Sequence, residues 1–282
     1  MTGKLWKWEW RRNSRMLLIA TGACVAAGLG GILLGLLKMP LLAVFGFIVV
    51  AIAAVVLPYL VTWLLAWRYW KTMYGGQGYF TNTIPVRGRS LFYAKANFAA
   101  LAGLLTMLIS CALLAGGAWS VFYATGTGRE GIDQALAHFR ENPTLWWFMI
   151  LLMVFSVVAM TYQVFGGISL GQGKGLVHMG AGGSILVLVI LYLVNQVVSL
   201  IGTFLIPGGL YLEGPHAGEF TSKTMLQDLI ETFRAVAANP DAYDPNAQTQ
   251  LIGLAFIPLL VIVTVAVVWM ATRSIEKHTS LR

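Results

Sequence analysis

Charged residues are scarce in this sequence. Only 11% of its 282 residues are Asp, Glu, Lys or Arg, whereas 58% are hydrophobic, and soluble domains carry about 25% charged residues. The chain also has only two cysteines, Cys24 and Cys111, and both fall within long apolar runs. We expect them to pack as small apolar side chains. This composition argues against an ordinary soluble enzyme, a disulfide scaffold and a cysteine-based metal site.

Long apolar runs stand where the charges are missing. An uninterrupted apolar stretch of about 18 residues or more is typical of a helix that spans a membrane. The sequence contains six such runs, at 16–37, 41–67, 96–123, 145–170, 185–206 and 251–270. We therefore predict an all-α integral membrane protein with six transmembrane helices, in which residues 1–282 form a single transmembrane domain.

Basic residues are divided unequally between the two sides of these predicted spans. Of the 19 Lys and Arg residues, 14 lie on the side of the N-terminus. Cytoplasmic segments are enriched in Lys and Arg, so both termini are predicted to be cytoplasmic. The net charge of +8 then reflects a basic rim that faces the anionic headgroups of the lipid bilayer, and no nucleic-acid partner is expected.

Three polar segments lie outside the predicted spans. In residues 1–15, tryptophan alternates with charge (KLWKWEWRRNSR), which predicts an N-terminal helix along the cytoplasmic interface. Residues 68–95 form a basic cytoplasmic loop between the second and third spans. Residues 207–250 are the largest external piece and contain an amphipathic helix that lies on the membrane or re-enters it. Its apolar face comprises Met225, Leu226, Leu229, Ile230 and Phe233.

No Asp, Glu, Lys, Arg or His occurs within the six apolar runs. Proton- or ion-coupled carriers and intramembrane proteases need such residues at membrane depth, so both classes are disfavoured, and no catalytic or metal site is predicted. Some amides and hydroxyls at depth are candidates for a substrate path, although interhelical hydrogen bonding is the simpler explanation for each alone. These candidates are Gln163, Asn195, Gln196 and Ser199.

Small residues recur every four positions in the first run, at Ala23, Ala27, Gly31 and Gly35. Such a stripe allows another helix to approach closely. It serves either packing within the chain or contact with a second chain, and we favour the dimer contact.

Two glycine-rich segments imitate nucleotide-binding motifs without meeting their requirements. The segment GTGREG (126–131) follows a membrane span and lacks the strand that a dinucleotide fold needs. The segment GQGKG (171–175) has Ile168 where a phosphate loop requires glycine, and Gly175 where it requires Ser or Thr. We therefore expect no nucleotide cofactor in this chain.

The loop sequence GYFTNTIPVRGRSLFYAK (78–95) resembles the loop after the second helix of ABC-2 type permeases, the membrane subunits of bacterial type-2 ABC exporters. Many members carry a Gly-Tyr-x-Thr-x-Thr-x-Pro-Val run, then a basic turn and a lysine near the start of the next helix. The matching residues here are Gly78, Tyr79, Thr81, Thr83, Pro85, Val86, Arg87, Arg89 and Lys95. A second match, at 162–200, contains SLGQGKGLVHMG and is similar to the family's turn between the fourth and fifth helices, but it keeps only Lys174 and His178 as basic residues.

The resemblance implies a permease subunit without ATPase activity of its own. Two permease chains, identical or different, pair on two copies of a separate ATP-binding subunit that holds ATP and Mg²⁺. A coupling helix in the loop 68–95 docks on that subunit. The first and fifth helices form the dimer seam, and the segment 207–250 is a re-entrant or capping hairpin. The docking residues would be Tyr79, Thr81, Thr83, Pro85, Arg87, Arg89, Lys95 and Lys174.

A bacterial inner-membrane exporter of drugs or peptides is thus the first hypothesis. The alternatives are a secondary carrier or channel that acts alone, and a non-transporting membrane scaffold or immunity protein. The sequence does not identify the cargo, because a mostly apolar path with a few amides suits hydrophobic drugs, peptides and lipids equally.

Overall fold

The computed structural model of the chain describes residues 2–78, 86–127, 130–131, 133, 137, 140, 143–173, 175–211, 218–238 and 251–278. Within this part of the chain, six helices are long and apolar enough to span a membrane. The predicted number and order of spans are therefore confirmed, and the chain is treated as a multi-pass membrane protein. The helices are α1 (Thr2–Gly35), α2 (Pro40–Met73), α4 (Gly88–Thr125), α6 (Pro143–Gly171), α7 (Ala181–Leu200) and α9 (Phe256–His278).

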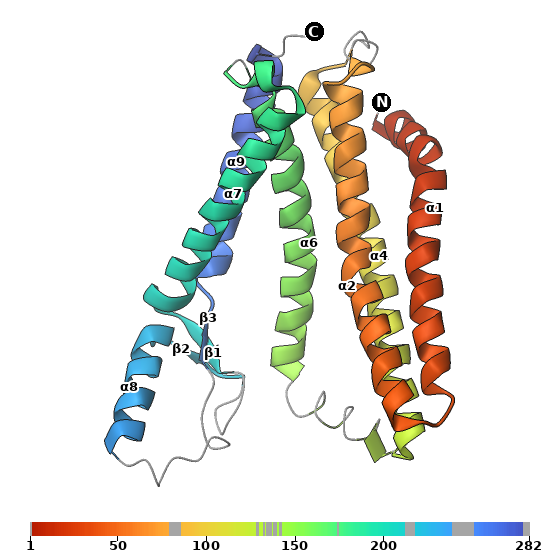
Figure 1. Ribbon diagram of the computed structural model, residues 1–282. Coiled ribbons are helices and arrows are strands. Elements are labelled where there is room, and N and C mark those ends of the chain that lie inside the picture. Colours follow the sequence, from red (N-terminus) through yellow and green to blue (C-terminus); the bar gives the residue numbers. More distant parts are fainter. Residues whose placement is uncertain are drawn as a thin grey trace.

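The six helices run alternately between two ends of the molecule. α1 begins and α9 ends at the same end, here called the terminus-bearing end, and the opposite end is the far end (Figure 1). At the terminus-bearing end the helices extend beyond the apolar runs: α1 includes the predicted interfacial segment, and α4 starts at Gly88. That segment is therefore the beginning of α1 and not a separate helix, although its first turns bend away from the rest of α1 (Figure 1).

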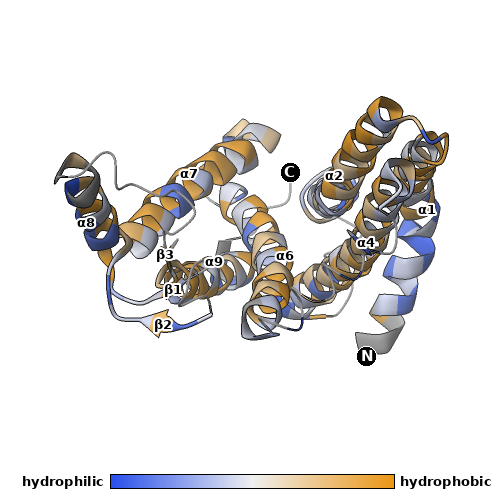
Figure 2. Cartoon of the chain, turned by 90° about the horizontal axis from the view of Figure 1, so that it is seen from below, coloured by the Kyte–Doolittle hydropathy of each residue, from blue (hydrophilic) through white to orange (hydrophobic). Residues whose placement is uncertain are grey.

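The helices form two groups of three. In the first group, α1, α2 and α4 pack on one another, and in the second group α6, α7 and α9 do so; Figure 2 shows the two groups side by side. The larger apolar core joins both groups near the terminus-bearing end, where Phe92 and Phe165 are buried. A smaller core, which contains Val50, Ala54 and Leu113, belongs to the first group alone. Toward the far end, α7 leans away from α2 (Figure 1).

The chain after α7 is more varied than predicted. A π-helical turn, η2 (Ile201–Leu205), follows α7, and strands β1 (Gly209–Tyr211), β2 (Phe220–Thr221) and β3 (Leu251–Gly253) form an antiparallel sheet in the order β2-β1-β3. The sequence predicted no strand, and it placed residues 251–253 in the sixth span. The apolar run there is continuous, so hydropathy does not separate the strand from the helix that follows.

The predicted amphipathic helix of the segment 207–250 is present as α8 (Met225–Ala238). Thr224 and Gln227 form a capping box at its start: the Gln227 N–H donates to the Thr224 hydroxyl (3.1 Å), and the Thr224 N–H donates to the Gln227 side-chain oxygen (3.2 Å). Lys223 donates to Glu231 (2.8 Å) on the exposed side of the helix, and this hydrogen bond raises the pKa of Lys223. α8 lies at the far end, beyond the end of α7 (Figure 1).

The stripe of small residues on α1 divides between two environments. A Cβ atom at Gly31 would lie 2.5 Å from the carbonyl oxygen of Gly46 on α2, and one at Gly35 would lie 2.5 Å from the hydroxyl of Ser120 on α4. These two glycines therefore pack within the chain, whereas Ala23 and Ala27 are exposed. A dimer contact through α1 stays a prediction, and the exposed alanines are the part of the stripe that a second chain can reach.

Replacing Gly31 by alanine should destabilise the fold by about 1–3 kcal/mol, because the contacting atom belongs to the backbone of α2 and the two helices would have to separate. The control is Gly30→Ala, since a Cβ atom at Gly30 meets nothing within 4 Å. The free energy of unfolding in mixed micelles measures both effects. Equal stability of the two variants would contradict the close helix contact.

Candidate functional site

A buried ion pair lies between the first and third transmembrane helices. Lys95 of α4 donates to the carboxylate of Glu9 on α1 at 2.5 Å, and their side chains are only 7% and 10% exposed. Asn13, one turn further along α1, donates to the same carboxylate at 2.9 Å. A buried charge pair is compatible with folding only when its hydrogen bonds are satisfied in this way. The pair therefore fixes the start of α1 against α4.

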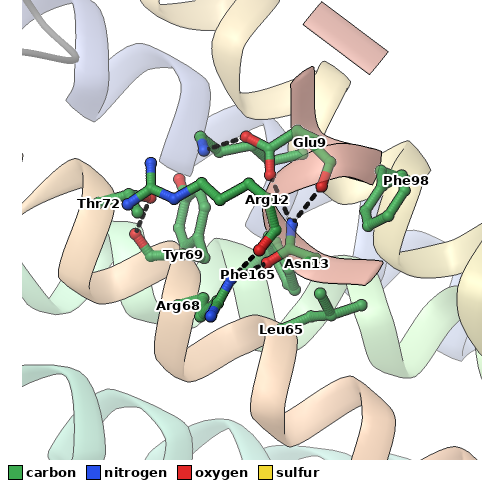
Figure 3. A pocket seen from close by; sticks show the side chains of 10 residues that line it. Glu9, Arg12, Asn13, Leu65, Arg68, Tyr69, Thr72, Phe98 and Phe165 are labelled. Atoms are coloured by element: carbon green, nitrogen blue, oxygen red, sulfur yellow. Dashed lines mark hydrogen bonds and ion pairs between the residues drawn. The ribbon is translucent and has the colours of Figure 1, made fainter. Parts of the chain in front are cut away.

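Further hydrogen bonds connect this pair to α2. The Arg68 guanidinium donates to the carbonyl oxygen of Arg12 (2.5 Å) and to the side-chain oxygen of Asn13 (2.9 Å). Arg12 in turn donates to Gln77, which follows the end of α2. Figure 3 shows Arg12, Asn13 and Arg68 converging from α1 and α2. The space between them is about 10 Å³, enough for about one water molecule. The cluster is therefore a structural junction and not a cavity for a substrate.

The start of α4, which follows the basic loop, contacts α9 of the second helix group. Arg87 directly precedes α4 in an extended conformation. Arg89 forms an exposed ion pair with Glu276 of α9 at 3.4 Å, and Gly88 lies against Ile275 of the same helix, where a Cβ atom would be 2.5 Å from its side chain. The start of α4 therefore lies against the end of α9.

The predicted docking residues divide into three sets. Arg87 and Arg89 are exposed at the start of α4, on the terminus-bearing end. Lys95 was predicted to lie on the docking surface, but its ammonium group is buried against Glu9. It is therefore not on a surface that a soluble partner reaches. The remaining residues lie outside the described part of the chain: Tyr79, Thr81, Thr83, Pro85 and Lys174.

Polar contacts join the two helix groups near the terminus-bearing end. The hydroxyls of Tyr69 on α2 and Ser169 on α6 are 2.6 Å apart, and the Tyr69 ring lies 4.6 Å from that of Phe165. Tyr162 of α6 donates to Asn97 of α4. With the pair of Arg89 and Glu276, these contacts make the terminus-bearing end the region where the groups are held together.

A cavity of about 390 Å³ lies between α6, α7 and α9, with Trp63 of α2 on one side. Its walls are mostly aliphatic and aromatic, and no charged side chain of the described residues lines it. Three of the four predicted path residues line this cavity: Gln163, Asn195 and Ser199. Gln196 does not; it is exposed and donates to the hydroxyl of Tyr192 on its own helix (3.3 Å).

Two of these side chains belong to a chain of hydrogen bonds across the three helices. The Asn195 amide donates to the side-chain oxygen of Gln163 (2.5 Å), and the Gln163 amide donates to the hydroxyl of Thr264 on α9 (2.8 Å). Thr264 was not predicted to belong to the site. It is the only side chain with a hydroxyl or amide in the apolar run 251–270. A single polar residue in an otherwise apolar span is the sequence feature that could have identified Thr264.

A second cavity, of about 470 Å³, lies between α4, α6 and α9. Thr264 lines this cavity, whereas Gln163 lines the first. The hydrogen bond between them therefore lies between the two cavities. Arg89, at the start of α4, also lines the second cavity.

Comparisons with known proteins found nothing similar: no family model matches the chain, and neither does any curated protein or solved structure. The likeness of residues 78–95 to ABC-2 permeases therefore remains a resemblance.

Removing one charge of the buried pair should be costly. Glu9→Gln or Lys95→Met alone leaves an unpaired buried charge and should lower the free energy of unfolding by about 3–5 kcal/mol. The double variant should recover part of the loss, because neither charge remains. As a control, Glu276→Gln removes one partner of an exposed pair and should cost less than about 1 kcal/mol. Denaturant titration in mixed micelles measures all four variants. A double variant no more stable than the singles would contradict the pairing.

Proposed function

We propose that this chain is the membrane subunit of an ATP-driven exporter of the ABC-2 type. ATP and Mg²⁺ are held by two copies of a separate ATP-binding subunit, which docks on the loop 68–95. The observation that carries the proposal is the attachment of this loop. On one side Gln77 accepts a hydrogen bond from Arg12 in the first helix group, and on the other side Arg89 pairs with Glu276 in the second.

This double attachment supports a coupling role. A partner that displaces the loop pulls on both helix groups at once, and the transmembrane helices behave as stiff levers because their backbone hydrogen bonds are internal. The groups are joined by polar contacts near the loop and diverge toward the far end (Figure 1). Small movements at the loop would therefore become larger movements at the far end.

The energy source follows from the lack of charge at depth. Transport coupled to an ion gradient uses charged or titratable side chains near the bilayer centre. The main cavity has no charged lining side chain among the described residues. Uphill transport by this chain would thus take its energy from the partner. In the same proposal the terminus-bearing end faces the cytoplasm of a bacterial cell, and two permease chains pair, in part through Ala23 and Ala27.

The proposal is tested by purifying the tagged chain from its own membranes in mild detergent and identifying co-purifying proteins by mass spectrometry. An ATP-binding subunit should be recovered in near-equimolar amount. Arg87→Glu/Arg89→Glu should reduce its recovery about tenfold or more, because like charges brought together at an interface cost several kcal/mol. The matched control is Arg11→Glu/Arg15→Glu, which reverses two exposed arginines of α1 near the same end.

A charge swap separates docking from the internal ion pair. Arg89→Glu/Glu276→Arg restores an ion pair between α4 and α9 while the loop keeps the reversed charge. If residue 89 contacts the partner, recovery of the ATP-binding subunit stays low in the swap. Full recovery would mean that Arg89 acts only within the chain. Absence of any ATP-binding subunit from the wild-type preparation would reject the proposal.

A further inference from the structure

A pocket between α1 and the end of α2, here called the basic pocket, lies at the terminus-bearing end. Its volume is about 240 Å³, far more than the about 10–15 Å³ that a single water molecule needs. Three cationic side chains line it together with two neutral ones, and no carboxylate of the described residues does so. The lining residues are Arg12, Arg68, Lys71, Thr72 and Gln77.

The cations of the basic pocket are not neutralised within the described part of the chain. Arg68 is part-buried, and its two hydrogen bonds go to neutral oxygens, those of the Arg12 carbonyl and the Asn13 side chain. The guanidinium of Arg12 donates to the neutral side chain of Gln77, and both residues line the pocket. Lys71 is exposed and forms no ion pair with a described residue.

The carboxylate of Glu9 does not compensate these charges. It is already hydrogen-bonded to Lys95 and Asn13, and it lines the neighbouring junction but not the basic pocket. A guanidinium has five N–H donors and an ammonium group has three, whereas the three cations make only three hydrogen bonds with described residues. An anion with several oxygen atoms would supply both the missing negative charge and the missing acceptors.

The basic pocket lies at the depth of the lipid headgroups. Arg68 directly follows the apolar run 41–67, and Lys71 lies one turn beyond Trp67 on the same side of α2. Trp67 is exposed and stacks on Trp70, with ring centroids 5.5 Å apart. Tryptophan is enriched where the membrane meets water, and basic pockets between transmembrane helices at this level bind anionic headgroups.

We propose that the basic pocket binds the phosphate group of an anionic phospholipid, whose acyl chains remain in the leaflet at the terminus-bearing end. Arg12 and Arg68 belong to different helices, so a bound phosphate would link α1 to α2. Phosphatidylcholine is disfavoured, because its quaternary ammonium group would bring a further positive charge beside three others. A pocket with fixed walls also predicts one bound lipid per chain. This inference does not rest on the proposed function, since lipid binding needs no ATP-binding partner.

Native mass spectrometry of the purified chain in mild detergent tests the site without an ATP-binding subunit. Dioleoyl phosphatidylglycerol and dioleoyl phosphatidylcholine are titrated separately, so the acyl chains are the same and only the headgroup differs. One phosphatidylglycerol per chain should bind about tenfold more tightly than phosphatidylcholine, as expected for several basic residues near an anionic headgroup. Inorganic phosphate at the same concentration should not displace it, because the acyl chains hold the lipid beside the helices.

Variants of Lys71 assign the preference to the basic pocket. Lys71→Glu places a carboxylate beside the two arginines, so phosphatidylglycerol and phosphatidylcholine should then bind equally. Lys71→Gln should weaken the binding of phosphatidylglycerol about fivefold. The matched control is Arg15→Glu, which makes the same change in charge at an exposed residue of α1 that does not line the pocket. This control should keep the tenfold preference.

Equal affinities for the two lipids in the wild type would overturn the proposal, and this comparison needs no variant. Equal losses in Lys71→Glu and Arg15→Glu would also overturn it, because the preference would then come from the overall charge of the basic rim. Displacement of the lipid by inorganic phosphate at equal concentration would mean that the pocket takes a soluble phosphate, against the lipid assignment. None of these results bears on the recovery of an ATP-binding subunit, so the proposed function is tested separately.

Discussion

The contact between Tyr69 and Ser169 joins two groups of helices that share few other polar contacts in the described part of the chain. Inside a bilayer every polar group needs a partner within the protein, so such contacts decide which helices move together. Here they gather toward the terminus-bearing end, beside the ion pair of Glu9 and Lys95 that holds the first group together. Toward the far end, the contacts within the first group include the close approach of Gly31 to Gly46.

The basic loop lies beside the polar contacts between the two groups, and the main cavity lies within the second group. The loop begins and ends where the polar contacts are, with one flank tied to Arg12 and the other to Glu276. The cavity lies between α6, α7 and α9 and faces α2 through Trp63, so movement of the second group relative to the first would change its shape. The hydrogen bond from Asn195 to Gln163 and the one from Gln163 to Thr264 link the three helices of the second group.

Hydropathy alone predicted the six spans, because the bilayer imposes a minimum length of apolar residues on each. It did not predict which way a side chain faces within a helix that is apolar all round. Asn195 and Gln196 are neighbours in sequence, yet only Asn195 lines the cavity, since successive residues of a helix point about 100° apart. Lys95 looked like part of the exposed loop because its partner, Glu9, is 86 residues away. Strand β3 was missed because its residues continue an apolar run.

The proposed function requires an ATP-binding partner to move the two groups about their joined end. Double electron–electron resonance on the purified complex measures this, after Cys24 and Cys111 are replaced. One pair of spin labels at the exposed positions Leu41 and Leu200 reports the distance between α2 and α7 near the far end, and a second pair at Trp67 and Ile185 reports it near the terminus-bearing end. We predict that ATP binding changes the far-end distance more than the other. Equal changes at both ends, or none at either, would contradict this movement.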